Sequence, residues 1–498
     1  MQRTLATSLF VALVPLGAPT QGPSDPTGRV QPDFGVDLPA QLAPGMTFPT
    51  LEGRINSWVF GDDPDEAEIY RHGWGLWAGL TTPTDKTAFG IENARIYQTW
   101  LAPLDIIASL RGEDQTAAIA LRTPLQHHGK SPGATLIAPS VANADGMHID
   151  DSVAEVVAYS PSAARHTYDN QLLFTEVLNE YLERGYPSIP RFPSDSITVK
   201  PVYKLISKEE LNEIDGKELY AMPAWPGIPS LDRTGKNSAE IAQIKAIEAN
   251  GFPPKDWGQC VYVDVNNSGA TSASGVDPTC KTPTADNTYG LGDFITIPIT
   301  GEDQVHFQTV THGGASNGTE QRKIEVGDIL LLVGMHVATR ETERWTWQSF
   351  WWAANPAEPG TPSSPEVAGA RPAELSHEAS HYAMVTAYSM LLPAQPLRGG
   401  RNTGELVVGF NPNLEAEFSP KNFKREDPVA TPNGIVSTNL GIQSNCMTCH
   451  GLANYGSPGA VYGANFYLSM DDPAKTAGLD VDFAWSIASE VVPRNKPE

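Results

Sequence analysis

Apolar residues recur at the 3.6-residue spacing of an amphipathic helix in several parts of the chain. The stretch 168–184 keeps its leucines and Val177 on one face and ends before a glycine. Residues 238–250 begin with a capping serine, Ser238, and are followed by a glycine. Residues 373–392 contain neither glycine nor proline and lie between two prolines, so they predict one helix of about five turns. We expect a last helix at 483–491.

Between these helices the pattern changes to short β-rich stretches. Residues 294–300, 305–311 and 328–339 are rich in β-branched and aromatic side chains and are separated by glycine-containing turns. They predict an antiparallel sheet, so the expected fold class is α+β. A group of tryptophans follows, and we expect it to fill the core at the sheet edge rather than to line a ligand site: Trp345, Trp347, Trp351 and Trp352.

Composition limits the classes of partner. With 34 Lys and Arg against 58 Asp and Glu, the 498-residue chain carries a formal charge of −24. Such a charge argues against nucleic acid or an anionic membrane surface as a partner. The apolar content of 40% indicates a folded globular protein of more than one domain.

One short motif carries specific chemistry. Cys446 and Cys449 are separated by two residues, and His450 follows directly. This sequence resembles the attachment motif of c-type cytochromes, in which two thiols bond to the porphyrin and the adjacent histidine ligates the iron. The resemblance implies one covalent haem c, held by Cys446 and Cys449, with His450 as the proximal ligand of the iron. The alternatives are a pair of buried thiols, a redox dithiol or half of a zinc site.

The resemblance covers only a C-terminal segment, 431–498, which we expect to form a small helical haem-binding part after the body at 21–430. Phe483 and Trp485 are expected to pack against the motif. The sixth iron ligand is open: Met470 lies 20 residues after His450, and His381 or His377 could reach the iron from the body. The remaining histidines form a wider pool of candidates: His72, His127, His128, His148, His166, His306, His312 and His336.

The N-terminal residues indicate export. Residues 1–20 combine Arg3, an apolar run and small residues, which is typical of a secretory signal and too short for a membrane span. We therefore expect a periplasmic or secreted protein with no membrane span in the mature chain. In that compartment Cys260 and Cys280 are expected to form a disulfide.

A second motif suggests a different function. His377-Glu378-Ala379-Ser380-His381 matches the H-E-x-x-H pattern of zinc metallopeptidases, in which a helix presents two imidazoles to zinc and the glutamate acts as general base. Glu405 is the only convenient third ligand for such a site.

The leading expectation is nevertheless one-electron transfer by a haem protein, or a periplasmic oxidoreductase with the haem at its centre. A basic protein would be favoured as the redox partner because the chain is acidic. The zinc metallopeptidase is the alternative.

Overall fold

The computed structural model describes residues 31–495 apart from 44, 62, 115–117, 123–152, 308–323, 424–428, 431–435, 438, 457–462 and 464. The expected signal segment, 1–20, and the boundary expected at residue 431 lie outside the described residues. So do His127, His128, His148 and His312. Residues Phe34–Glu498 group into one unit, to which the description below applies.

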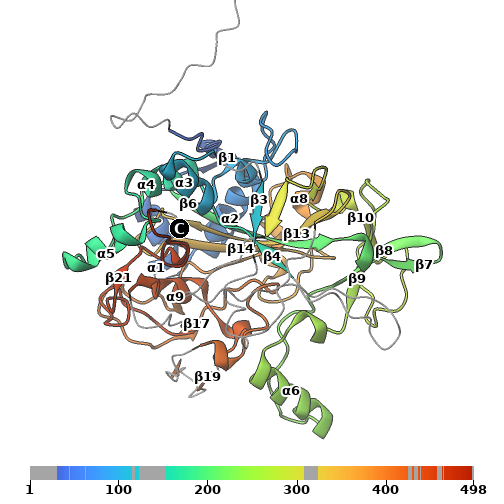
Figure 1. The fold of residues 1–498 in the computed structure, drawn as a ribbon. Helices are drawn as coiled ribbons and strands as arrows, with labels where there is room; N and C mark the ends of the chain where they lie inside the picture. The colour runs from blue at the N-terminus through green and yellow to red at the C-terminus, as the bar shows by residue number, and fades with distance from the viewer. Residues whose placement is uncertain are drawn as a thin grey trace, which may run out of the picture. The chain divides into compact units, whose positions relative to one another are not determined.

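The largest sheet is antiparallel and runs in the order β15-β14-β13-β6-β4, with β11 beside β13 and β5 beside β6 (Figure 1). Its strands are β4 (Ala154–Glu155), β5 (Ala158–Tyr159), β6 (Ile197–Ile206), β11 (Thr296–Pro298), β13 (Ile329–Thr339), β14 (Thr346–Trp352) and β15 (Tyr382–Thr386). A smaller sheet has the order β10-β9-β8-β7 and contains β7 (Asn212–Ile214), β8 (Lys217–Pro223), β9 (Cys260–Asp264) and β10 (Thr288–Gly290).

Two-stranded pairs complete the described strands: β1 (Gln41–Ala43) with β2 (Met46–Thr47), β3 (Ile119–Leu121) with β12 (Val305–Phe307), β16 (Leu391–Leu392) with β17 (Glu405–Leu406), β18 (Val429–Ala430) with β19 (Val436–Ser437), and β20 (Asn454–Tyr455) with β21 (Leu479–Asp480). The described α-helices are α1 (Glu52–Phe60), α2 (Glu66–Leu80), α3 (Pro103–Arg111), α4 (Pro161–Asp169), α5 (Thr175–Glu183), α6 (Ser238–Asn250), α7 (Pro365–Gly369), α8 (His377–Ser380), α9 (Cys446–Gly451) and α10 (Trp485–Ser489). Helices and antiparallel strands thus form the expected α+β fold.

The two faces of the main sheet are covered by different parts of the chain. Side chains alternate along β14, so Trp347 points to one face while Phe350 and Trp352 point to the other. On the second face, α2 stacks Trp77 on Phe350, with ring centroids 4.5 Å apart. On the first face, α9 brings His450 to a centroid distance of 4.2 Å from Trp347. The sheet therefore separates α2 from the C-terminal segment.

The helix predictions have mixed outcomes. The helix at 238–250 is confirmed as α6, although Asn237 rather than Ser238 supplies the capping oxygen. The single helix predicted at 168–184 is wrong: α4 and α5 are separated by a turn in which Gln171 has a φ of 52°. The backbone of this turn is hydrogen-bonded to the C-terminal part of the chain, because the N–H of Val492 donates to the carbonyl of Leu173.

The helix predicted at 373–392 is also wrong. Only His377–Ser380 is helical, and β15 begins at Tyr382 and pairs with β14. In β15 these residues form hydrogen bonds with β14 and are buried in the sheet. These gains outweigh the helical preference of a stretch that contains no glycine or proline. The last helix is shorter than the predicted 483–491, since α10 spans Trp485–Ser489.

The strand predictions are largely confirmed. β11 and β13 fall within the predicted 294–300 and 328–339 and pair with each other in antiparallel fashion. β12 begins at Val305 as predicted but pairs in parallel with β3, outside the main sheet. Trp345, Trp347, Trp351 and Trp352 are all buried, which confirms their expected place in the core.

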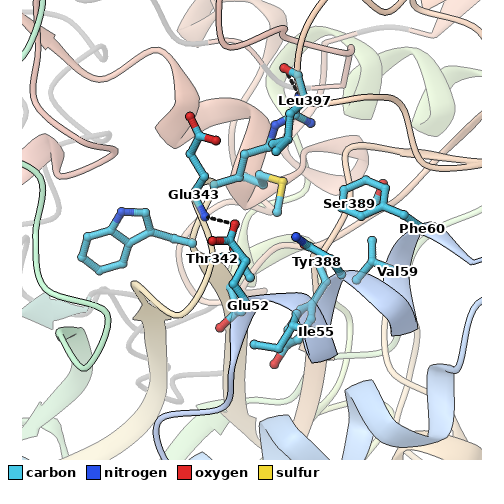
Figure 2. A pocket seen from close by; sticks show the side chains of 14 residues that line it. Glu52, Ile55, Val59, Phe60, Thr342, Glu343, Tyr388, Ser389 and Leu397 are labelled. Atoms are coloured by element: carbon cyan, nitrogen blue, oxygen red, sulfur yellow. Dashed lines mark hydrogen bonds between the residues drawn. The ribbon is translucent and has the colours of Figure 1, made fainter.

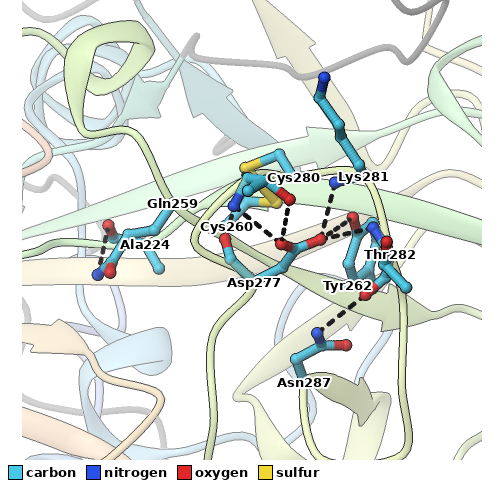
Figure 3. The surroundings of a disulfide bond; sticks show 10 residues. Ala224, Gln259, Cys260, Tyr262, Asp277, Cys280, Lys281, Thr282 and Asn287 are labelled. Carbon is cyan, nitrogen blue, oxygen red and sulfur yellow. Dashed lines mark hydrogen bonds between the residues drawn. A yellow bond between two sulfur atoms is a disulfide. The ribbon is translucent and has the colours of Figure 1, made fainter.

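The predicted disulfide joins Cys260 and Cys280 (Figure 3). Closing a loop of this length is worth about 3 kcal/mol on the chain-entropy estimate. Asp277 organises the same loop, because its carboxylate accepts hydrogen bonds from the backbone N–H groups of Lys281 at 2.7 Å and Thr282 at 2.6 Å. The hydroxyl of Tyr262 donates to it as well, at 2.9 Å.

Asp277→Asn should therefore destabilise the protein in a pH-dependent way. Burial alone would raise the pKa of Asp277, but the hydrogen bonds from Thr282 and Thr279 outweigh it and lower the pKa. A carboxylate of this kind stabilises the fold above its ordinary pKa of about 3.9, and the contribution is lost as pH falls below that value. We expect Asp277→Asn to lower the free energy of unfolding by about 1–3 kcal/mol at pH 7.

Urea unfolding at pH 7, 4 and 3 tests this expectation. The difference between the wild type and the variant should shrink as pH falls below about 4. A difference that stays constant over this range would show that the negative charge of Asp277 is not the stabilising feature.

Within the described part of the chain, the helices are all too short or too polar to cross a membrane.

Candidate functional site

The start of α9 is fixed by a buried asparagine. The side-chain oxygen of Asn445 accepts a hydrogen bond from the backbone N–H of Thr448 at 2.9 Å, which caps the helix. Its amide group donates to the carbonyl oxygens of Ser389 at 2.9 Å and Val407 at 2.8 Å. Asn445 thus ties the first turn of α9 to the body of the protein.

The motif residues share one side of α9. Cys446, Cys449 and His450 stand at i, i+3 and i+4, and all three are half-buried, whereas Met447 and Thr448 between them are buried. Both thiols are free in the structure. The helix therefore presents the two thiols and the imidazole together, as the sequence spacing predicts.

The imidazole of His450 has a defined orientation. Its Nδ1 lies 2.9 Å from the carbonyl oxygen of Phe483. A carbonyl can only accept, so Nδ1–H donates and the lone pair of Nε2 is left for another ligand. Burial lowers the pKa of His450 to about 3, while the hydrogen bond to Phe483 opposes this shift. The ring is therefore neutral at ordinary pH, which is the form that binds a metal.

The Phe483 carbonyl is held in place by an unusual turn. Asp482 and Phe483 have φ angles of 52° and 68°, and such left-handed conformations cost non-glycine residues about 1–3 kcal/mol each. The buried carboxylate of Asp482 offsets this cost by accepting hydrogen bonds from Arg191 at 2.8 Å, from the N–H of Phe192 at 2.9 Å and from Arg340 at 3.1 Å. Asp482 therefore positions the group that orients His450.

A buried lysine, Lys475, contacts the C-terminal end of α9 from a later segment of the chain. The Nζ of Lys475 donates to the carbonyl of Gly451 at 3.2 Å and to Asp480 at 3.3 Å. It also lies 4.2 Å from the ring centroid of Phe483. A cation at this position satisfies the last carbonyl of the helix. Sequence reasoning missed both Lys475 and Asp482, because nothing in the local sequence shows that they face α9.

Two residues expected to pack against the motif do so. Phe483 supplies the carbonyl described above, and its ring centroid is 6.4 Å from that of Trp347. The indole N–H of Trp485 donates to the carbonyl of Cys449 at 3.2 Å.

The environment of the thiols differs from that of a reactive dithiol. Burial raises the pKa of Cys449 to about 12 and raises that of Cys446 well above its ordinary value. Redox-active Cys-x-x-Cys pairs lower the pKa of a thiol, since the thiolate is the nucleophile. The environment of the two thiols therefore does not match that of a redox-active dithiol.

A small pocket of about 80 Å³ opens beside His450. This volume is smaller than the roughly 300–1,000 Å³ of sites that hold drug-sized ligands. The first face of the main sheet forms one wall, through Lys200, His336 and Trp347, and Trp485 lies on the side of the C-terminal segment. The pocket is thus shared between the body and the segment that carries the motif.

Basic groups line this pocket together with the imidazoles. Lys200 pairs with the buried carboxylate of Glu155, its Nζ 2.6 Å from Oε2. Arg122 also pairs with Glu155, at 3.2 Å, and with Glu490. The Nε2 of His336 lies 3.0 Å from a carboxylate oxygen of Glu415. Each of these three basic groups therefore already has a carboxylate partner within the protein.

The residues proposed from the sequence as sixth iron ligands do not line this pocket. Met470 is buried in the core cluster that contains Met447 and Leu468. His381 lies beside Trp352, with ring centroids 6.1 Å apart, on the opposite face of the sheet. Trp352 and Trp347 are five residues apart on β14, or about 17 Å along the strand. Of the histidines in the wider pool that the structure describes, His336 lines the pocket.

The buried side of α9 contributes to a second, very small pocket of about 10 Å³ (Figure 2). Met447 lines it together with residues of α1 and of the loop before β14. In this loop the N–H of Glu343 donates to Glu52 at 2.9 Å, and Arg344 donates to the carbonyl of Leu397 at 2.8 Å. These contacts fix the loop against α1 and against the segment that contains Leu397.

A separate group of potential metal ligands lies around α8. The two imidazoles of the H-E-x-x-H sequence do converge, with the Nε2 atoms of His377 and His381 3.2 Å apart. The third group is Asp293, not Glu405, which lies exposed in β17. Asp293 is 84 residues before His377 in the chain, so no sequence spacing could have indicated it.

Glu378 does not face the two histidines. Its carboxylate pairs with the guanidinium of Arg95. Burial would raise the pKa of Glu378, but its hydrogen bonds and the charge of Arg95 outweigh this and lower the pKa. A general base beside a zinc-bound water would have to point toward the imidazoles.

Comparison of the chain with protein-family models, with curated proteins and with solved structures finds no match.

Proposed function

We propose that the protein is an exported haem c protein that carries out one-electron redox chemistry. In this proposal Cys446 and Cys449 bind the haem covalently, and His450 ligates its iron. The observation that carries this proposal is the orientation of His450, whose Nδ1 is occupied by the Phe483 carbonyl at 2.9 Å while the two thiols share its side of α9. A metal-ligating histidine typically donates its other ring N–H in this way.

The residues around the motif fit such a group. Haem supplies a one-electron couple at its iron. The hydrogen bond from Nδ1–H of His450 to the Phe483 carbonyl makes Nε2 a stronger ligand for the iron and fixes the plane of the imidazole ring. Trp347 and Trp485 add aromatic walls to the pocket beside His450, which suits an apolar ring system.

We further propose a periplasmic or secreted location and a basic redox partner. The signal-like segment at 1–20 supports export, and the charge of −24 would steer a basic protein towards the surface. The disulfide between Cys260 and Cys280 suits an oxidising compartment.

The pocket favours an oxidoreductase over a simple electron carrier. Space remains beside His450, and His336, the imidazole across it, is engaged by Glu415 at 3.0 Å. We therefore expect the iron to keep an open position, with His336 nearby as a hydrogen-bonding group.

Absorption spectroscopy on protein from a host that matures c-type cytochromes tests two claims, that the protein binds covalent haem and that the iron keeps an open coordination position. A pyridine haemochrome assay should report one haem c per chain, and the reduced protein should bind carbon monoxide. Absence of haem would refute the proposal. Haem that is present but does not bind carbon monoxide would instead indicate a filled sixth position and an electron carrier.

The zinc metallopeptidase remains as a second candidate, because the imidazoles of His377 and His381 converge. The ion pair between Glu378 and Arg95 counts against it, since the base is turned away. Glu378→Gln would abolish a peptidase activity of this type.

A further inference from the structure

Three side chains from two distant parts of the chain meet at a single point. Asp293 follows β10, and His377 and His381 belong to the turn formed by α8. One carboxylate oxygen of Asp293 lies 2.8 Å from Nε2 of His377 and 3.7 Å from Nε2 of His381. The two Nε2 atoms are 3.2 Å apart, so the three atoms form a closed triangle.

The size of this triangle suits a metal ion. Two ligand bonds of about 2.1 Å at angles between 90° and 109° place their donor atoms about 3.0–3.4 Å apart. A hydrogen-bonded chain from Asp293 through His377 to His381 does not explain both short distances, because both involve the same Nε2 atom of His377, which carries either one hydrogen or one lone pair. It would give no reason for His381 to approach the same carboxylate oxygen at 3.7 Å.

The carboxylate of Asp293 is oriented by its surroundings. Asp293 is fully buried, and its second oxygen accepts hydrogen bonds from the hydroxyl of Thr271 at 2.8 Å and the N–H of Gly290 at 2.9 Å. The indole of Trp352 donates to the Asp293 backbone carbonyl at 3.0 Å and stacks beside His381. Outer partners of this kind fix ligands in metal sites.

One side of the group is open to solvent. The side chain of His377 is 47% exposed, whereas those of Asp293 and His381 are 0% and 10% exposed. Three protein ligands with an accessible side leave room for water or a substrate, as in catalytic zinc sites and in iron sites with two histidines and one carboxylate.

We propose that Asp293, His377 and His381 bind one divalent transition-metal ion with open coordination positions. This inference goes beyond the haem and does not rest on it, because the ligands lie on the opposite face of the main sheet from Trp347 and His450. If both sites are loaded, the protein holds two metal centres, one near each end of β14.

Titration of the full chain, treated first with a chelator to remove ions from this site, with Co²⁺ tests the proposal by visible absorption and calorimetry. We expect one Co²⁺ per chain. His377→Gln should weaken binding by more than 100-fold, since losing an outer partner alone costs about 10- to 100-fold. Thr271→Val, which removes only such a partner, should weaken it by about 10- to 100-fold. Glu378→Gln is the matched control on the same short helix, and it should bind as the wild type does.

His377→Gln is the deciding variant because the exposed side chain can change without disturbing the fold, and circular dichroism verifies this. Wild-type protein that binds no Co²⁺, or His377→Gln protein that binds it equally well, would overturn the proposal in favour of a hydrogen-bonded relay. A chain with Cys446→Ser and Cys449→Ser should still bind one Co²⁺, which separates this site from the thiols. Binding lost in that chain would also overturn it.

Discussion

Replacing both Cys446 and Cys449 with serine should yield folded but colourless protein. The two thiols are half-buried, whereas Met447 and Thr448 between them are buried. Serine keeps the size of the side chain but cannot form a thioether. We therefore expect complete loss of covalently bound haem, measured as the mass of the intact chain and as haem staining after denaturation.

Each single variant should keep one thioether and bind less haem. The matched control is Cys260→Ser with Cys280→Ser, which removes the other cysteine pair. That control should lose about 3 kcal/mol of stability from the opened loop but keep its covalent haem. Covalent haem that persists after loss of both Cys446 and Cys449 would contradict the assignment of the motif.

Asp482→Ala should destabilise the protein and change the properties of the bound iron. The substitution removes the buried carboxylate that pairs with Arg191 and Arg340, and breaking such a pair costs about 3–5 kcal/mol. Arg191 keeps its second ion pair, with Asp480 at 3.2 Å. It also releases the turn that aims the Phe483 carbonyl at His450. We expect a lower free energy of unfolding in urea and, in the haem-loaded protein, a shifted reduction potential.

The reduction potential of the haem distinguishes a role of Asp482 in positioning His450 from a role in stability alone. Asp482→Asn keeps the shape and part of the accepting capacity, so it should restore some of the stability and move the potential less. Glu180→Gln, in an exposed pair with Arg184, should change stability by less than about 0.5 kcal/mol and leave the potential unchanged. A destabilised Asp482→Ala protein with an unchanged potential would show that Asp482 has a structural role only.

Local sequence was enough wherever a short range of residues decides the structure. Helix α6 was predicted to the residue because its start and its following glycine lie within one continuous stretch. The side of α9 shared by Cys446, Cys449 and His450 follows from helical spacing alone. The disulfide could be predicted because only two cysteines remained outside the motif.

Predictions failed where distant segments compete for the same residues. The stretch 373–392 has no helix-breaking residue, yet Tyr382 begins a strand because β14 offers it a partner, Trp352, 30 positions earlier. The stretch 168–184 is interrupted because Leu173 pairs with Val492 near the opposite end of the chain. No local pattern contains these partners.

The sequence by itself determined that two thiols and a histidine share one helical face, that the chain is strongly acidic, and that His377 and His381 converge. The tertiary structure alone decided that Phe483 orients His450, that Lys200 and His336 share its pocket, and that Asp293 completes the group at α8. The physical reason is that spacing within one helix or strand is fixed by backbone geometry. Contacts between elements depend instead on which buried faces and ladder partners the whole chain brings together.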